Sequence, residues 1–359
     1  MGWLAGWAKR EAITVTNGTA DLTDFTKVVI LTADTKRADA LATGYDIRFT
    51  ASDGTTLLYH KREAWAGGGG SNVDAIFKVK VPSIYHTTGA AIYIYWGKAG
   101  APDTSDTVNC WDANLVEAWD MKDLTTSTIA GDKGYGLNKI EANGPIEGTG
   151  IIGKAQVFDG SNDFITGATS PTVATTNITM SAWANVLTTS EKGTIVHNGS
   201  NAGNGYTLGV GNTTLDTAGN NLIVLLDGVA FLNFAKSIGT GWHLLSVTRG
   251  ANTWLGYVDG VVSATTFTTN PTAPNTGFRI GKDVDGAYAR LWNSGIDDVR
   301  VSTIARAAEW LEYQFGEINE AGNRLAWGGV ENASSGHPAI KRFGGIPFTR
   351  NQSQGVQIW

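Results

Sequence analysis

Short stretches in which apolar and polar residues alternate recur through the first hundred residues. The clearest are AIFKVKVP (75–82) and AAIYIYWG (90–97), and such alternation predicts half-buried β-strands. Further strands are predicted at ITVTN (13–17), KVVILT (27–32), YDIRFT (45–50) and TTLLYHKR (55–62). Asp53-Gly54 is a hairpin signal, and the four glycines at 67–70 predict a mobile loop. The pattern predicts a small antiparallel β-sandwich over residues 1–100.

Residues 111–319 show a longer series of short, evenly spaced strand patterns. They include LVEAWDM (115–121), KAQVFDG (154–160), ITMSAWANV (178–186), LIVLLDG (222–228), WHLLSVTRG (242–250), TWLGYVDGVV (253–262), FRIGKD (278–283) and GIDDVRVS (295–302). Asp259-Gly260 predicts a further hairpin. This spacing is typical of a sandwich or jelly roll. One helix is predicted at 304–318, from an apolar stripe at helical spacing; Glu317 and Glu320 at its end are expected to cap it or face solvent.

Two segments show neither the alternation of a strand nor the spacing of a helix. Residues 101–110 are polar and contain glycine and proline, which predicts a linker. Residues 320–359 mix apolar residues with basic residues, glycine and proline; they are too apolar for a solvated linker and too short for their own core. We therefore predict an extended C-terminal arm that docks onto a partner through Arg342, Phe343, Phe348 and Trp359.

Composition and charge narrow the classes of function. Charged residues make up only 17% of the chain, while it has 46 glycines and 13 tryptophans, which favours β-structure joined by tight turns. The net charge of −6 lacks the basic footprint of a nucleic-acid binder, so no nucleic acid is expected as a partner. No apolar run reaches the ~18 residues of a membrane span. Cys110 is the one cysteine, so no intrachain disulfide can form and we expect a buried or half-buried thiol.

The second region resembles the concanavalin A-like, laminin-G-like domains. GKAQVFDGSNDFI (153–165) is similar to the family's opening strand, GWHLLSVTRGANTWLGYVDGVV (241–262) to its paired strands, and GIDDVRVSTIARAAEWLEYQF (295–315) to its closing strand and helix. The first region, through YDIRFTASDGTTLLYHKREAW, FKVKVP and IYIYWGK, resembles a poorly characterised β-domain that precedes such domains in bacterial and phage surface proteins. The resemblance implies an all-β protein: a small sandwich, then a concanavalin A-like jelly roll, a short helix and the arm.

The resemblance also indicates where to look for a metal. Calcium prefers carboxylate and carbonyl oxygens from loops, and the family places an aspartate after an early strand and an acid in the closing strand. Asp132 and Asp298 hold those places here, and Asp159 is a third candidate ligand. The alternatives are that Asp159 is a turn residue beside Gly160 and that Asp298 binds backbone at the base of a loop.

The second region also contains candidate sugar-binding residues but lacks the carboxylate pattern of a related group of enzymes. Aromatic and amide side chains at a sandwich rim can contact sugars, which makes Trp254, Tyr288, Trp292 and Asn201 candidates; core packing for the tryptophans and a simple turn for the asparagine are the alternatives. Related glucanases carry two glutamates with an aspartate between them on one strand, and no predicted strand here carries that set. We predict a protein that is not an enzyme; a glycoside hydrolase is the least favoured class.

These observations lead to a prediction for the function. The N-terminal residues MGWLAGWAKREAITV lack the apolar core of a secretory leader, whereas lectin-like domains usually act outside cells. We therefore predict a bacteriophage virion protein, a capsid-decoration, head-fibre or tail-associated subunit released by lysis. Its expected partners are other virion proteins or further copies of itself, and surface glycans. A secreted or cell-surface carbohydrate-binding adhesin is the alternative.

Overall fold

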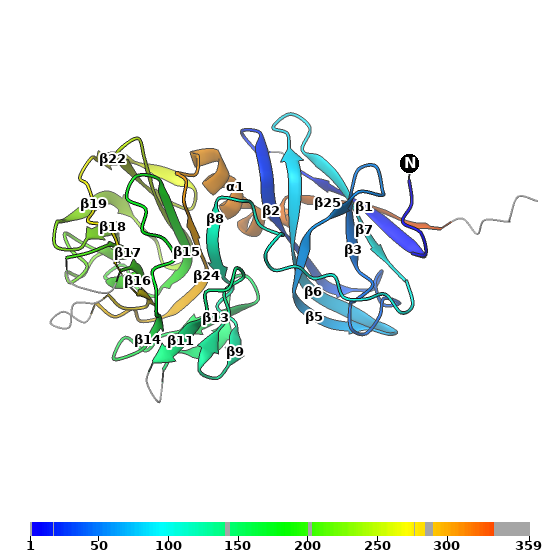
Figure 1. The fold of residues 1–359 in the computed structure, drawn as a ribbon, viewed down its shortest axis with the longest axis horizontal. Coiled ribbons are helices and arrows are strands. Elements are labelled where there is room, and N and C mark those ends of the chain that lie inside the picture. Colours follow the sequence, from blue (N-terminus) through cyan, green and yellow to red (C-terminus); the bar gives the residue numbers. More distant parts are fainter. Residues whose placement is uncertain are drawn as a thin grey trace, which may run out of the picture.

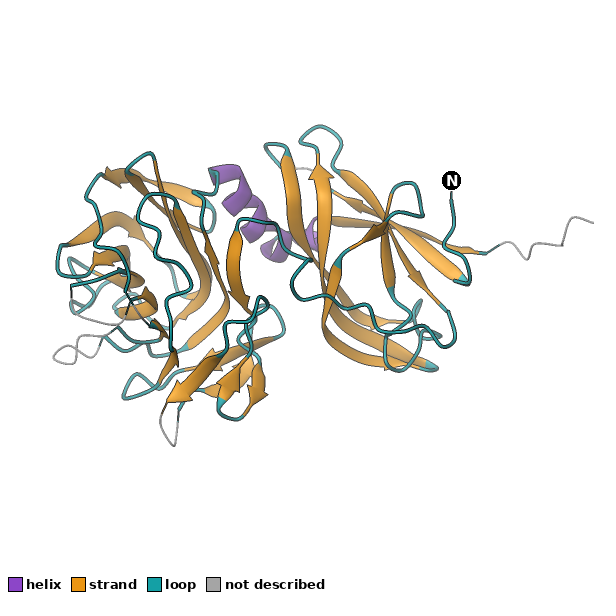
Figure 2. Cartoon of the chain, in the orientation of Figure 1, coloured by secondary structure: helices purple, strands orange, loops and turns teal. Residues whose placement is uncertain are grey.

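The computed structural model describes residues 2–16, 18–140, 144–199, 203–275, 277–283 and 290–333. Two β-domains lie side by side, and helix α1 (Ala308–Asn319) lies between them (Figure 1). Strands dominate both domains (Figure 2). In the described part of the chain, no helix is long and apolar enough to cross a membrane. The all-β prediction is confirmed.

The first domain is a sandwich of a five-stranded and a three-stranded antiparallel sheet, as far as its residues are described. Ile13, Phe49, Phe77 and Ile94 belong to the apolar core of this domain. The five-stranded sheet has the order β25 (Leu325–Asn332), β1 (Lys9–Val15), β7 (Ala90–Trp96), β3 (Arg48–Ala51) and β4 (Leu57–Leu58). The other sheet has the order β2 (Leu22–Asp34), β6 (Ser71–Ile84) and β5 (His60–Gly68).

Strand β25 corrects the prediction of an extended arm over 320–359. After α1 and a short 3-10 helix, η1 (Ala321–Arg324), the chain returns to the first domain, where β25 pairs antiparallel with β1. Leu325 is buried against the first domain's core, because its apolar side chain continues the inner face of that sheet. Only residues 334–359 remain of the predicted arm, and Arg342, Phe343, Phe348 and Trp359 lie outside the described residues.

The second domain stacks a nine-stranded sheet on an eight-stranded one, counting described strands. The first has the order β19 (Ala230–Ser237), β18 (Asn221–Leu226), β17 (Tyr206–Gly211), β16 (Gly193–Asn198), β23 (Phe278–Ile280), β14 (Phe164–Gly167), β11 (Leu137–Ile140), β10 (Thr128–Ile129) and β9 (Asp123–Thr125). The second contains β12 (Ile146–Thr149), β13 (Lys154–Val157), β24 (Gly295–Ser302), β15 (Ile178–Val186), β20 (Gly241–Gly250), β21 (Thr253–Val258), β22 (Val261–Phe267) and β8 (Leu115–Trp119). The large apolar core of the domain lies between them.

The predicted hairpin at Asp259-Gly260 joins β21 to β22. Both residues have positive φ, +55° and +73°, as a two-residue turn between twisted antiparallel strands requires. The run 67–70 is not the mobile loop that its composition predicts. It turns β5 into β6, and the amides of Gly69 and Gly70 donate to the carbonyls of Ala40 and Ala38.

The two domains share a packed apolar interface. Val28 of β2 is fully buried together with Ile152, Trp183 and Leu244 of the second domain. Helix α1 contributes to both sides: Phe315 stacks on Trp183, whereas the Tyr313 hydroxyl donates to the carbonyl of Thr16. The predicted linker, 101–110, follows the first domain, where the Asp106 amide donates to the carbonyl of His60. The domains are therefore held as one body by packed side chains.

Candidate functional site

Two predicted sugar contacts are core residues. Trp254 and Trp292 are both fully buried in the core of the second domain. The Trp254 indole nitrogen donates to the carbonyl of Thr269, and its ring packs edge-on against Tyr206. Neither tryptophan can stack on a sugar at the surface, because each fills the space between the two sheets. Tyr288 and Asn201 lie outside the described residues.

The structure brings Asp132 and Asp298 into one buried ionic network between the domains. Lys61 of β5 binds Asp132, at 2.6 Å, and Asp120. Lys78 of β6 binds Asp298, at 2.9 Å, and the same Asp120. Two lysines of the first domain thus join three aspartates of the second.

Arginine and tryptophan complete this network. Arg300 binds Asp298 at 2.7 Å, and the Trp111 indole nitrogen donates to Asp132 at 2.8 Å. Burial favours the neutral acid at Asp298, but Arg300 and Lys78 outweigh it and lower the pKa of that carboxyl. Burial, reinforced by the charge of Asp120, raises the pKa of Glu63 to about 8. The network is a set of matched buried charges that joins the domains.

The donor set does not fit calcium. Ca²⁺ takes about six to eight oxygen ligands, and the carboxylates of Asp132 and Asp298 are bound by ammonium, guanidinium and indole N–H groups. Asp159 is exposed, and its carboxylate accepts from the amides of Ser161 and Asn162, as a turn residue does. Among the described residues, no three His, Cys, Asp or Glu side chains are grouped as a metal site would need.

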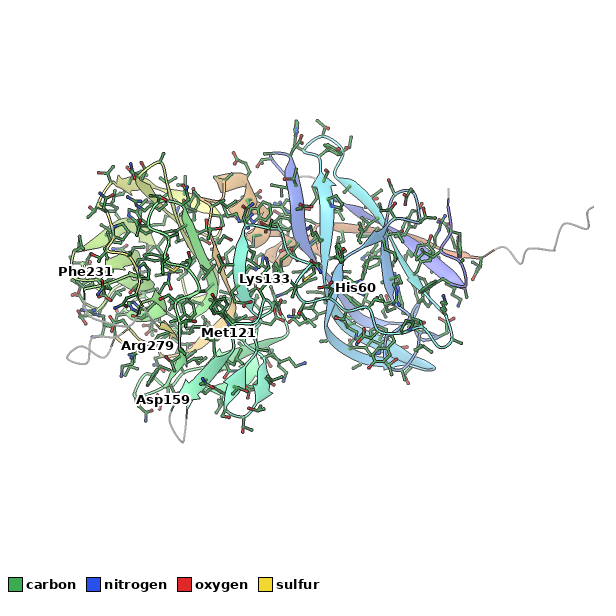
Figure 3. The ribbon with its side chains drawn as sticks, in the orientation of Figure 1. His60, Met121, Lys133, Asp159, Phe231 and Arg279 are labelled. Atoms are coloured by element: carbon green, nitrogen blue, oxygen red, sulfur yellow. The ribbon has the colours of Figure 1, made fainter. Side chains whose placement is uncertain are left out.

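A row of residues crosses the outer face of the nine-stranded sheet. The strand registers align eight residues, one from each of eight neighbouring strands: Thr128, Asn138, Thr166, Arg279, His197, Thr207, Leu225 and Phe231. Their chain neighbours, such as Ile165 and Ile280, are core residues, so the row faces away from the core. Figure 3 shows Arg279 and Phe231 in the part of the second domain away from the first. We call these eight residues the outer-face row.

One half of the outer-face row is covered. His197 and Thr207 are fully buried, and the His197 Nδ1 lies 2.6 Å from the Thr207 hydroxyl. Burial, with the charges of Arg279 and Arg290, lowers the pKa of His197 to about 3, so this imidazole is neutral at pH 7. Arg290 lies over Phe231, 5.2 Å from the ring centre, and binds Asp283 at 2.6 Å. This half is structural.

The other half of the outer-face row is open. Asn138 is exposed, and Thr128, Thr166 and Arg279 are half-buried. Phe164, two residues before Thr166, points to the same face, with the Arg279 guanidinium 5.4 Å and the Lys282 ammonium 4.9 Å from its ring centre. Hydroxyl, amide and guanidinium groups in one plane can donate to and accept from a polyhydroxylated ligand. The open half is the candidate binding site.

Comparison with known families identifies the second domain. Residues 159–312 match the sequence model of the concanavalin A-like lectin/glucanases superfamily. These residues form a concanavalin A-like domain. Residues 43–124 match a domain of unknown function (DUF2341). The predicted resemblance, a concanavalin A-like domain preceded by an uncharacterised one, is confirmed, and no curated protein sequence gives a match to the chain.

Comparison with solved structures gives matches at low identity and with TM-scores below 0.5. Domain 4 of AbnA, an extracellular arabinanase from Geobacillus stearothermophilus, solved with arabinotriose, is 17% identical with a TM-score of 0.45, over 55% of this chain and 97% of that one. The binding domain of botulinum neurotoxin DC in complex with SialylT is 11% identical with a TM-score of 0.44, over 58% and 52%. The chain therefore spans about half of that neurotoxin domain. Likeness at this level says nothing about what the present chain binds.

Sequence reasoning missed the residues of the open half. Arg279 stands between core residues Phe278 and Ile280, and Thr166 follows core residue Ile165. The alternation in FITG and FRI predicts an outward side chain at each position. Which outward positions share a row depends on the order and register of strands far apart in sequence, so the pattern alone could not assemble the site.

Proposed function

We propose that the protein is a non-catalytic glycan-binding protein, and that the open half of the outer-face row is its binding site. The observation that carries the proposal is the chemistry of that row: two threonines, an asparagine and an arginine lie on one strip of the nine-stranded sheet, where Asn138 is exposed and the others are half-buried. Thr166 and Arg279 lie within the residues that match the concanavalin A-like superfamily. The Asn138 amide and the Arg279 guanidinium offer donors, and the hydroxyls of Thr128 and Thr166, which hydrogen-bond to the Thr125 hydroxyl and the Phe278 carbonyl, can still accept from a ligand.

The same row supports a role without catalysis. Glycoside hydrolysis needs two carboxyl groups, about 5–5.5 Å apart for retention or about 6.5–9.5 Å for inversion. The eight residues of the outer-face row include no carboxylate. Asp283, which lies beside the row, is fully buried and bound to Arg290.

A glycan array probed with the full chain tests the proposal. We expect binding that the double variant Asn138→Ala/Thr166→Val weakens about tenfold, because it removes an amide and a hydroxyl from the open half. Thr266→Val, an exposed threonine on strand β22 of the other sheet, is the matched control and should bind like the wild type. Equal weakening by both variants, or no binding to any glycan, would overturn the proposal. Because the aspartates do not fit calcium, chelation with EDTA should leave binding unchanged.

Whether the protein binds glycans as part of a virion or at a cell surface stays a prediction. A phage virion subunit is favoured by the sequence argument, and a secreted or cell-surface adhesin is the alternative. Deleting residues 336–359 tests the first, since the residues proposed to anchor the subunit lie there. A virion subunit should lose assembly while both domains stay folded; if the truncated chain still assembles fully, those residues are not the anchor.

A further inference from the structure

Two cations, Arg279 and Lys282, lie beside Phe164 at the open half of the outer-face row. In the described part of the chain, neither Arg279 nor Lys282 forms an ion pair, and Arg279 Nη1 donates to a backbone carbonyl, that of Asp283, at 2.9 Å. By contrast, Arg290, which lies over Phe231 in the covered half, is bound to Asp216 at 3.0 Å and to Asp283 at 2.6 Å. Among the described residues, Arg290 is therefore neutralised by two carboxylates, whereas Arg279 and Lys282 at the open half have no carboxylate within ion-pair distance.

Phe164 fixes the place of both cations. The Arg279 guanidinium and the Lys282 ammonium each lie within cation–π range of its ring. Arg279 is additionally anchored by strand pairing on both sides, to Thr166 and to His197. Preorganised charges of this kind lose little conformational entropy when an anion binds.

Burial makes these charges receptive to an anion. Arg279 is half-buried, and desolvation lowers its pKa despite the nearby charge of Asp283. An arginine remains protonated at neutral pH all the same. A partly desolvated cation lacks full solvation by water, so a charge-assisted hydrogen bond to an anionic ligand restores stabilisation that burial removed. The chain's net charge of −6 gives no general attraction for anions, so any such attraction is local.

We infer that the ligand of the open half is an acidic saccharide, whose carboxylate or sulfate binds Arg279 and Lys282 while its hydroxyls bind Asn138 and Thr166. This inference rests on the proposed glycan-binding function and specifies its ligand class. A planar guanidinium fits two oxygens of a carboxylate or sulfate at once, and a lysine adds a point charge that accepts either geometry.

Matched pairs of polymers test the charge requirement. Binding of the full chain is measured by titration calorimetry against polygalacturonate and its methyl ester, and against dextran sulfate and dextran. We expect at least one charged polymer to bind at least tenfold more tightly than its neutral counterpart, with affinity falling as salt rises. The first pair isolates a carboxylate and the second a sulfate, so the two sources are distinguished.

Charge-removing variants locate the site. Lys282→Gln and Arg279→Gln should each weaken binding of the charged polymer about tenfold. Lys236→Gln, on strand β19 of the same sheet, makes the same change of charge at a half-buried lysine outside the row and should change it less than twofold. Thermal melting of each variant checks that the fold is retained.

The outcomes separate this inference from the proposed function. Glycan-array binding with no preference for the charged polymers overturns the inference and leaves the glycan-binding function standing. Charged-polymer binding that Lys236→Gln weakens as much as Lys282→Gln shows unspecific charge attraction and also overturns it. If neither the array nor any polymer shows binding, both proposals fall.

Discussion

Replacing Lys78 with methionine tests whether the buried ionic network holds the two domains together. Lys78 is fully buried on β6 and binds Asp298 at 2.9 Å, Asp120 and, more weakly, Glu63 at 3.4 Å. Methionine keeps much of the volume and the apolar stem. It removes one of the two cations that bind each of two buried carboxylates of the other domain, Asp298 and Asp120.

The geometry sets the size of the expected effect. At 2.9 Å and an effective dielectric constant of about 20, one ion pair is worth ~6 kcal/mol of Coulomb energy. Desolvation of each ion costs several kcal/mol in the opposite direction, and removing one member of a buried pair typically costs about 3–5 kcal/mol. We expect Lys78→Met to lower the free energy of unfolding by that amount, a large share of the about 5–15 kcal/mol of a typical domain.

Urea unfolding followed by circular dichroism measures this change, with Lys154→Met as the control. Lys154 forms its ion pair with Glu147 at 2.9 Å, but its side chain is 51% exposed, so its loss should cost under ~1 kcal/mol. Adding Asp120→Asn to Lys78→Met should recover part of the loss, because the remaining buried charges are then paired, Lys61 with Asp132 and Arg300 with Asp298. Equal effects of Lys78→Met and Lys154→Met would refute the reasoning.

Three further predictions concern other buried features. With its pKa raised to about 8, Glu63 binds a proton more tightly in the folded state than in the unfolded state, so the stability that it contributes is lost as pH rises from about 5 to 8. Glu63→Gln should flatten this decline in urea titrations, and an unchanged decline would contradict the prediction. Burial raises the pKa of the Cys110 thiol to about 12. Its reaction with a disulfide reagent at pH 8 should therefore be about a thousandfold slower in the native protein than in urea. Comparable rates in the two conditions would show an accessible thiolate. A chain ending at Arg324 lacks β25 and leaves the edge of β1 free, so it should self-associate in light scattering, unlike a chain ending at Ala333; identical behaviour of the two would count against a protective role for β25.

The sequence pattern predicted the elements better than their surroundings. Alternation in AIYIYW corresponds to β7, and Asp259-Gly260 forms the predicted hairpin, since both signals depend on a residue and its chain neighbours. Lys61 and Lys78 occupy polar positions of alternating strands, which normally face solvent, yet here they face the second domain. Periodicity reports which side of a strand a residue lies on, and not what covers that side.

Glu317 at the end of α1 and the two tryptophans of the second core show the same limit of local sequence patterns. Glu317 was expected to cap the helix or face solvent, but it is fully buried, accepts from the Val28 amide at 2.9 Å and lies 3.4 Å from Lys27. Its partner is 290 residues away in the chain, beyond the reach of any local pattern. Trp254 and Trp292 were sugar candidates by residue type alone, and their burial follows from the stacking of two sheets that no single strand reveals.

The pairing of β1 with β25 has a consequence for synthesis of the protein. About 230 residues separate the end of β7 at Trp96 from the start of β25 at Leu325. At ~5–20 residues per second, a ribosome needs ~10–50 s to make them. Throughout that time the nascent first domain lacks its edge strand, so β1 awaits a partner that has not been translated, whereas Asp120 and Asp132, which bind the buried Lys61, are made early in the interval. The concanavalin A-like domain is thus an insertion whose folding precedes completion of the domain that encloses it, and a chaperone that shields β1 would act within this interval.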